Sequence, residues 1–362
     1  MAESANIDPE LMEQLSESLA ALPEATIDGI CHEQMADTRL RPDAFLKAQV
    51  AGRALTFVIE TRGDVYPRDA REITWQFDRY RRETGRDGQD LIPMILARSV
   101  SEGAREFLRE ERVAYHDQSG SLFISAGDLY LLIDRPKPKS SKRREFNVFK
   151  GTRARVLFVL FDHVGDWVTG SEIAEEANVS PATVSETFKN LERRDWLEVK
   201  GEGPSKRRRL ARPDALLDAW RDSILASRPT KRKRYFVARM SPEDMAHQIE
   251  GENYYDDYEL ELTGQFAAQQ YTPFLSSVSD LTVRTFGRRN HEWLVSVLNA
   301  REVSEGANLA IIDAPSKKMR HRQNHDQSSL LASPLQVYLD LLEGHGRSKE
   351  MAEHLRSQQL EW

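Results

Sequence analysis

Two groups of polar residues between positions 180 and 209 have the types and spacing needed to bind a phosphate backbone and to read base edges. The first group is spread over the segment 180–193, and the second is a run of four cations that follows Gly203-Pro204-Ser205. Hydroxyl groups and a lysine on one helix face can contact phosphates and base edges, and consecutive cations suit the phosphate backbone. The candidate DNA-binding residues are Ser180, Thr183, Ser185, Lys189, Arg193, Lys206, Arg207, Arg208 and Arg209.

The elements that must position these residues follow the order of a winged helix-turn-helix, in which the third helix enters a DNA groove. The third helix has a strong start at Ser180-Pro181, because serine caps free backbone N–H groups and proline fits the first helical position. The expected elements are helices at 152–163, 171–177 and 181–195 and strands at 197–200 and 208–211.

The third helix has one apolar side. Val184, Phe188 and Leu191 recur at intervals of four and three residues, so they should face the core and leave Lys189 and the hydroxyl groups outside. The alternative is a helix-turn-helix that packs only against protein, and Glu186 on the outer face counts slightly in its favour. The combination of this motif with a basic wing favours double-stranded DNA as the partner.

A second constellation lies near the N-terminus. Asp43, followed by Glu60-Thr61-Arg62 at the end of an expected strand, resembles the Asp…Glu-x-Lys pattern of restriction-endonuclease-like folds. In active members two carboxylates hold a metal and the lysine assists the attacking water. Arg62 stands in place of that lysine, and a guanidinium keeps its proton near neutral pH. We therefore expect a degenerate nuclease-like site (Asp43, Glu60, Arg62) without metal or cofactor; the alternative is a metal-dependent nuclease guided by the winged helix.

Composition indicates an ordinary multidomain protein. At 362 residues, with 40% hydrophobic and 30% charged residues, the chain should hold two or three domains. Cys31 is the single cysteine, which excludes an internal disulfide and multi-cysteine metal sites. No apolar run approaches the ~20 residues of a membrane span, and the acidic first residues do not form a signal peptide. These features predict a cytoplasmic protein.

The net charge of −7 hides a strong asymmetry along the chain. From Arg135 to Arg234 there are 24 Lys and Arg against 14 Asp and Glu, a net charge of +10, so the remainder carries −17. Such a distribution indicates that one segment meets nucleic acid while the others have different roles.

Strand and helix patterns alternate on both sides of the winged helix, which predicts an α/β (α+β) multidomain fold. A hairpin with its turn at Gly52 is expected over 43–62, and strands are expected at 281–286, 293–297 and 308–312. The expected divisions are an N-terminal helix plus a degenerate restriction-endonuclease-like α/β domain at 1–135, a basic linker at 136–150, the winged helix at 151–226 and a last α/β domain at 227–362.

Several stretches occur in a fixed order along residues 40–350. They are 57–62 with Tyr66-Pro67-Arg68, 111–117, the winged helix followed by 214–220, Leu262-Thr263-Gly264 and 333–341. Taken in this order, they resemble the AbiEi-like antitoxins of bacterial type IV toxin–antitoxin systems. This resemblance implies a DNA-binding antitoxin that represses its own operon and counters a nucleotidyltransferase toxin encoded beside it.

The same resemblance implies a nucleotidyltransferase-like fold for the last domain. Leu262-Thr263-Gly264 stands where an active enzyme would need a Gly-Ser phosphate loop followed by paired metal-binding aspartates, and Asp280 is isolated. We therefore expect no transfer activity and no enzymatic function. We also expect a homodimer, because repressors usually pair two winged helices on one palindromic site. A plasmid replication or partition factor is a further alternative.

Overall fold

The computed structural model describes residues 8–22, 24–31, 42–83, 91–135, 147–256, 258–314 and 330–362. It forms two compact units. The N-terminal unit is Met1–Glu145 with Glu192–Asp195, and the C-terminal unit is Phe146–Leu191 with Trp196–Trp362. Residues 136–146 of the expected basic linker lie outside the described residues.

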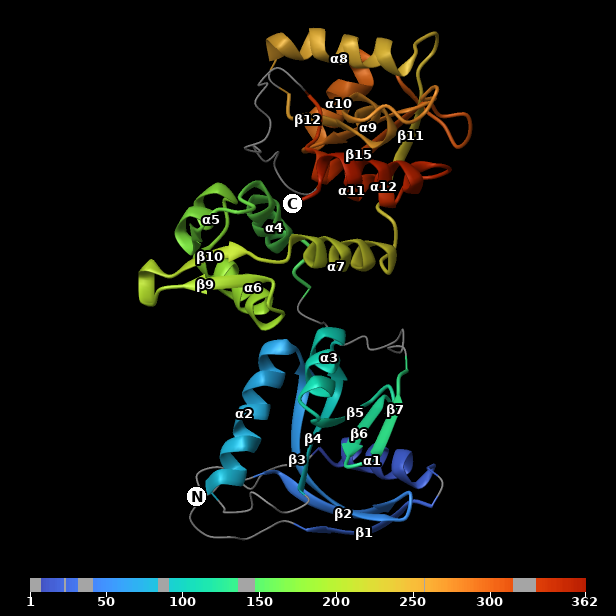
Figure 1. The fold of residues 1–362 in the computed structure, drawn as a ribbon. Helices are drawn as coiled ribbons and strands as arrows, with labels where there is room; N and C mark the ends of the chain where they lie inside the picture. The colour runs from blue at the N-terminus through green and yellow to red at the C-terminus, as the bar shows by residue number, and fades with distance from the viewer. Residues whose placement is uncertain are drawn as a thin grey trace. The chain divides into compact units, whose positions relative to one another are not determined.

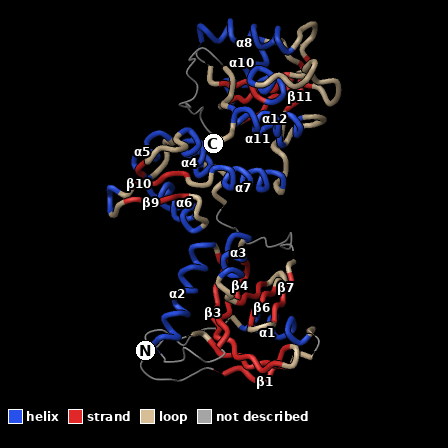
Figure 2. Tube along the Cα trace, viewed as in Figure 1, coloured by secondary structure: helices blue, strands red, loops and turns tan. Residues whose placement is uncertain are grey.

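The N-terminal unit is built on a seven-stranded sheet whose strands stand in the order in which they occur in the sequence (Figures 1 and 2). β3, β4 and β5 run parallel to one another, and the other neighbouring strands are antiparallel. The strands are β1 (Thr26–Cys31), β2 (Ala44–Val50), β3 (Arg53–Val65), β4 (Leu91–Val100), β5 (Ala114–Asp117), β6 (Leu122–Ala126) and β7 (Leu129–Ile133).

Helices cover both faces of this sheet. Helix α1 (Pro9–Ala20) lies on one face, and α2 (Pro67–Glu83) and α3 (Glu102–Glu110) lie on the other (Figure 1). Successive residues of β3 pack into the apolar cores on opposite faces of the sheet, because Phe57 packs with α1 while Val58 packs with α2. That alternation follows from the two-residue period of side chains along a strand.

The predicted hairpin over 43–62 is confirmed, and its turn fixes the register. Ala51 and Gly52 both have positive φ, 51° and 75°, which is the backbone of a two-residue turn that matches the twist of antiparallel strands. Val50 therefore pairs with Arg53, and at the other end of the hairpin Ala44 pairs with Ile59. This register brings Asp43, which precedes β2, beside the end of the pairing on β3.

The C-terminal unit begins with the winged helix. The predicted order of three helices and two wing strands is confirmed, and a further strand, β8, joins the wing to give the sheet order β8-β10-β9. The elements are α4 (Thr152–Asp162), β8 (Val168–Thr169), α5 (Gly170–Glu176), α6 (Pro181–Arg193), β9 (Leu197–Lys200), the 3-10 turn η1 (Gly203–Ser205), β10 (Arg207–Leu210) and α7 (Pro213–Leu225).

The rest of this unit carries a five-stranded sheet in the order β12-β13-β15-β11-β14, with β13 and β15 parallel. The strands are β11 (Lys233–Phe236), β12 (Leu260–Thr263), β13 (Leu281–Thr285), β14 (Arg301–Glu302) and β15 (Leu309–Asp313). The helices are α8 (Pro242–Asp256), α9 (Gly264–Tyr271), α10 (Arg288–Val297), α11 (Pro334–Leu342) and α12 (Ser348–Gln359).

The expected strand at 293–297 is wrong, because this segment belongs to helix α10. His291, Leu294 and Leu298 are its buried positions, which is helical spacing. The apolar, β-branched residues Val295 and Val297 lie between them and gave the segment its strand-like composition.

Helix α11 connects the two halves of the C-terminal unit. All of its residues except the half-buried Gln336 are buried, and it packs against α7 of the winged helix as well as α9, α12 and β12. A single apolar cluster consequently extends from Val156 and Phe188 of the winged helix to Tyr338 and Leu355 near the end of the chain. In the described part of the chain, no helix is long and apolar enough to cross a membrane.

Candidate nucleic-acid interface

Helix α6 begins at a side-chain cap. The Ser180 hydroxyl accepts a hydrogen bond from the Thr183 backbone N–H at 3.2 Å and lies 2.9 Å from the Thr183 hydroxyl. Pro181 is the first helical residue. The cap predicted from the sequence is therefore present, and it satisfies a backbone donor that would otherwise have no partner in the helix.

The two faces of α6 differ in the way that the sequence predicts. Val184, Phe188 and Leu191 are each at most 1% exposed, so they anchor the helix in the core. Ser185 and Lys189 lie on the exposed face. Of the other candidate residues, Ser180 is exposed, whereas Thr183 and Arg193 are half-buried. Glu186, which is not a candidate, is exposed as well.

The four cations of the wing are not equivalent. Arg209 donates to Glu198 at 2.5 Å and lies over the Trp167 ring, 5.0 Å from its centroid. The Arg208 guanidinium lies 5.0 Å from the centroid of the Phe188 ring. Lys206 is half-buried, and Arg207 is the exposed member of the run.

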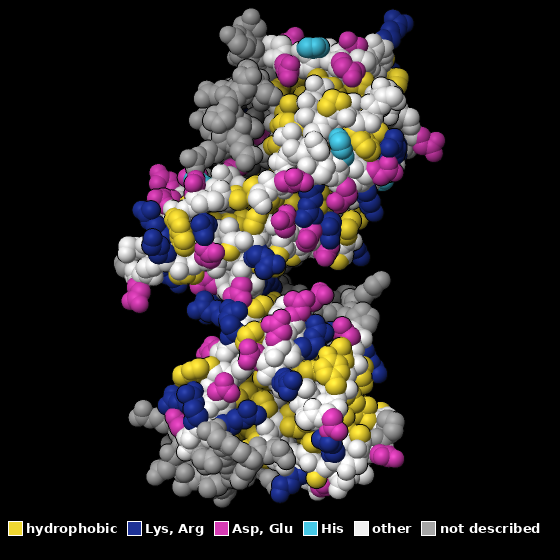
Figure 3. Space-filling model, in the orientation of Figure 1, with side chains coloured by type: hydrophobic (Ala, Val, Ile, Leu, Met, Phe, Trp, Pro, Cys, Tyr) yellow, Lys and Arg dark blue, Asp and Glu magenta, His cyan; other side chains and the backbone are white. Residues whose placement is uncertain are grey.

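Lysine and arginine side chains gather beside the wing on the face shown in Figure 3. An exposed guanidinium such as that of Arg207 is well placed to meet a phosphate, because it is open to solvent. The sequence alone gives no reason to distinguish the four cations. The structure distinguishes Arg209, because it forms an ion pair with Glu198 on the neighbouring strand.

Residues 149–209 match the model of the MarR family. The match covers α4, the helix-turn-helix and nearly all of the wing. No curated protein and no solved structure matches the chain. A MarR-type winged helix points to a DNA-binding transcriptional regulator, and the exposed face of α6 with the adjoining wing is the surface through which such a domain meets double-stranded DNA.

The Asp43, Glu60 and Arg62 side chains come together at the sheet of the N-terminal unit. One Asp43 carboxylate oxygen accepts from the Thr61 backbone N–H and from the Thr61 hydroxyl, both at 2.7 Å. Arg62 and Glu60 form an ion pair at 2.9 Å, and Arg62 also donates to the Thr61 carbonyl at 2.8 Å. The hairpin register places these groups side by side, as the sequence pattern predicts.

Glu60 has an unusual protonation behaviour. Burial, and next the neighbouring Asp43 carboxylate, raise the pKa of Glu60 to about 7, and the Arg62 guanidinium opposes that rise. The folded state therefore holds a proton, between about pH 4.5 and 7, that the unfolded chain has released. Folding stability then falls as the pH rises through this window, and Glu60 contributes no further change above it.

Glu60→Gln is expected to reduce the loss of stability between pH 5 and pH 8, by roughly 1–3 kcal/mol, because a neutral amide replaces the group that must ionise. Urea unfolding of the N-terminal unit at the two pH values measures the effect. Glu72→Gln, an exposed position on α2, is the matched control. An equal loss of stability in the wild type and in Glu60→Gln would exclude Glu60 as the source.

The segment Leu262-Thr263-Gly264 joins β12 to α9 in the C-terminal unit. The Leu262 side chain lies in the apolar core, and the Thr263 side chain meets a buried carboxylate. The Thr263 hydroxyl donates to Asp340 at 2.7 Å. Arg284 forms an ion pair with the same carboxylate at 2.7 Å, and Gln336 donates to it at 3.0 Å.

Asp340 is 6% exposed. Its importance is missed by sequence reasoning because its partners lie on β12, β13 and one turn earlier in α11. Asp280 precedes β13, and burial raises its pKa. Within the described residues, no group of three or more His, Cys, Asp and Glu side chains is close enough to hold a metal ion.

Proposed function

We propose that this chain is a sequence-specific, double-stranded DNA-binding transcriptional repressor. The observation that carries the proposal is a MarR-type winged helix in which Ser185 and Lys189 form an exposed helix face and Arg207 an exposed wing cation. The exposed helix face would read base edges in a groove, and the wing would hold the phosphate backbone beside it.

Replacing Lys206 and Arg207 together by alanine is expected to weaken binding to all DNA sequences. Each lost phosphate contact should reduce the slope of log K against log salt by about one unit, because fewer counterions are released on binding. Arg209→Ala is the matched control: its guanidinium is held by Glu198, so its loss should change the slope less. Titrations at several salt concentrations, with specific and random duplexes, measure both. An unchanged slope in the double variant would remove the wing from the interface.

Lys189→Ala tests sequence reading separately from phosphate binding. If Lys189 contacts a base edge, its loss should cost about 1–3 kcal/mol on the preferred site and much less on random DNA. Competition binding between the two duplexes measures the difference. Equal losses on both would identify Lys189 as a phosphate contact only.

The repressor should act as a homodimer. A single winged helix covers few base pairs, and two copies related by a twofold axis gain affinity and length of site on a palindrome. Light scattering of the free chain and of its DNA complex measures the assembly. A single copy in both states would reject this part of the proposal.

The resemblance to AbiEi-like antitoxins supports a more specific role, in which the chain represses its own operon and counters a nucleotidyltransferase toxin. Sequencing of genomic DNA that co-purifies with the chain tests this role. Enrichment of the DNA upstream of its own gene, and co-purification with the product of an adjacent toxin-like reading frame, are the expected results. Enrichment of a plasmid origin instead would favour the replication or partition factor.

We further propose that the N-terminal unit does not cut DNA. The support is the Arg62 guanidinium bound to Glu60, since it cannot accept a proton from an attacking water near neutral pH. Supercoiled plasmid incubated with the chain in magnesium and then in manganese should stay intact. Nicking that is lost in Glu60→Ala but retained in the Lys206 and Arg207 double variant would favour a metal-dependent nuclease over a repressor.

A further inference from the structure

Helix α6 carries one exposed carboxylate, that of Glu186, whose side chain is 59% exposed. At about 100° per residue, Glu186 lies roughly 200° round the helix from Val184, which is 1% exposed. Its side chain therefore starts on the side of α6 opposite the core. Ala182 and Lys189, its neighbours one turn before and one turn after, are exposed as well. Glu186 thus lies in the middle of the surface that the proposed function assigns to DNA.

Glu186 also lies in the N-terminal half of α6. It is the sixth of the 13 residues of the helix, and recognition helices contact base edges with their N-terminal residues. The exposed residues before it, Ala182 and Ser185, have short side chains. They leave room for the backbone of α6 to come close to the base pairs, within reach of a longer side chain such as that of Glu186.

A carboxylate at this position has an electrostatic cost, because the phosphates of any duplex repel it. Within the described residues, its one ion pair is with Arg153 of α4, whose guanidinium lies 3.4 Å from the Glu186 carboxylate. Both side chains are partly open to solvent, and an exposed pair of this kind adds little to the stability of a fold. A residue that lowers the affinity for every sequence is useful when it favours one sequence over the others.

The base edges of DNA differ in what they offer to a carboxylate, which can only accept hydrogen bonds. In the major groove, cytosine and adenine present a donor, in each case an amino group. The adenine amino group adjoins the N7 acceptor, which repels a carboxylate, whereas cytosine presents its N4 amino group alone. Guanine and thymine present acceptors and no donor in this groove. Cytosine is therefore the base that matches Glu186.

We propose that Glu186 selects a C·G base pair in each half-site by accepting a hydrogen bond from the N4 amino group of cytosine. Arg153 acts as a positioning residue: its guanidinium holds the carboxylate on the exposed side of α6 and offsets part of its repulsion by the phosphates. This role of Glu186 rests on the proposed repressor function and names one base pair that the repressor reads.

Glu186→Gln keeps the length of the side chain but presents an acceptor and a donor together, which match the N6 amino group and N7 of adenine. The full-length wild type and the variant are each incubated with duplexes of random sequence, and the bound duplexes are sequenced. We expect C at one position of each half-site for the wild type and A at that position for the variant. In titrations of the two duplexes, the wild type should bind the C duplex about tenfold more tightly, and the variant should reverse the order.

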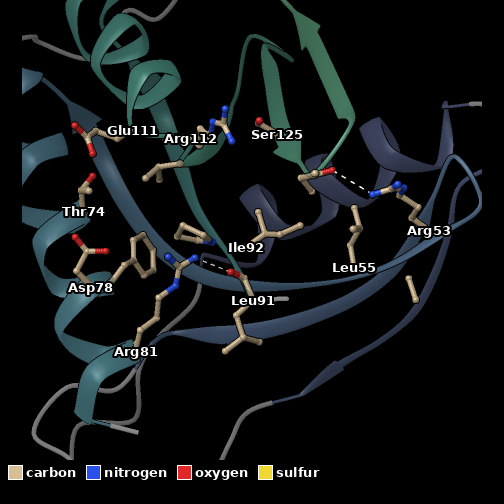
Figure 4. A pocket seen from close by; sticks show the side chains of 16 residues that line it. Arg53, Leu55, Thr74, Asp78, Arg81, Leu91, Ile92, Glu111, Arg112 and Ser125 are labelled. Atoms are coloured by element: carbon tan, nitrogen blue, oxygen red, sulfur yellow. Dashed lines mark hydrogen bonds between the residues drawn. The ribbon is translucent and has the colours of Figure 1, made fainter. Parts of the chain in front are cut away.

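Asp78→Asn is the matched control, because it also removes one negative charge from an exposed helix position. Asp78 belongs to α2 of the N-terminal unit, where it borders a pocket (Figure 4), and it is not among the proposed DNA contacts. This variant should leave the base preference and the affinity for random duplexes unchanged. Glu186→Gln should bind random duplexes about two- to fivefold more tightly at low salt, because a repulsion between the carboxylate and the phosphates is lost.

Arg153→Gln tests the positioning role. It should reduce the preference for C over A about threefold when Glu186 is present and should not change the base preference of Glu186→Gln, since coupled residues do not act additively. An equal reduction in both backgrounds would make Arg153 an independent DNA contact and would remove its positioning role.

Base selection by Glu186 is overturned if the wild type selects a sequence and every position keeps its preferred base, with the same strength, in Glu186→Gln. The repressor proposal stands in that case. A wild type that binds all duplexes equally, or none, overturns the repressor proposal and base selection by Glu186 with it. Melting temperatures within about 2 °C of the wild type show that these exposed substitutions leave the fold intact.

Discussion

A fragment of residues 147–226 is expected to unfold and to lose DNA binding, although it contains the complete winged helix. The reason is the core that the winged helix shares with the end of the chain. Leu216, Leu217 and Trp220 of α7 are buried in the cluster that also contains Tyr338 of α11. In the fragment the side of α7 that packs on α11 would face water.

Trp220 stays covered in the fragment, because its ring packs on Phe149 and Phe158. Exposing a large apolar side chain costs about 1.5–3 kcal/mol, so uncovering two of them on the α11 side of α7 costs several kcal/mol. That is comparable with the whole stability of a typical domain, about 5–15 kcal/mol. A fragment of residues 147–362 keeps the shared core and is the matched control. Circular dichroism melting and DNA titration compare the two. If the short fragment melts at the same temperature and binds DNA with the same affinity, the contact with α11 carries little free energy.

Asp340→Ala is expected to destabilise the C-terminal unit by about 3–5 kcal/mol, because it leaves the largely buried Arg284 guanidinium without its carboxylate. The same substitution leaves the Thr263 hydroxyl and the Gln336 amide without their common acceptor. Asp222→Ala on α7 removes an exposed carboxylate that pairs with Arg221, and is the control. It should change stability by less than about 1 kcal/mol.

The double variant Arg284→Met with Asp340→Leu separates the cost of an unpaired charge from the value of the ion pair. Replacing both charges by apolar side chains removes the uncompensated guanidinium, so most of the stability should return. Urea unfolding at one pH measures all four proteins. If the double variant is as unstable as Asp340→Ala, the hydrogen bonds of Thr263 and Gln336, rather than the charge of Arg284, determine the effect.

The winged helix was predictable because its signals are local. Ser180-Pro181 marks a helix start within two residues, and Val184, Phe188 and Leu191 mark the buried face within three turns. Strand β8 was not predicted, since a two-residue strand has no period of its own and exists only through its pairing with β10. The hairpin that holds Asp43 beside Glu60 was predictable for the same local reason, its turn at Gly52.

The features that depend on distant residues could not be read from the sequence. Asp340 is one carboxylate in an apolar helix, and its partners Thr263 and Arg284 are 77 and 56 positions away. Thr74 is one hydroxyl on a helix, and only the folded structure shows that its oxygen is buried without a hydrogen-bond partner among the described residues. The strand prediction for 293–297 was wrong for a related reason. The composition of the segment favours a strand, but burial of Leu294 and Leu298 on one side is compatible with a helix.

The order of strands in the two sheets has a consequence for synthesis on the ribosome. In the N-terminal unit each strand pairs with the strand made just before it, from β1 to β7, so that sheet can assemble as the chain emerges. Sheets built from neighbours in sequence need little loop closure and form early. The C-terminal unit differs, because the core beneath the winged helix lacks α11 until roughly 100 more residues have been translated, about 5–20 s later. During this interval the apolar side of α7 in the nascent winged helix is exposed to water. We expect a chaperone to bind the chain at this stage of synthesis.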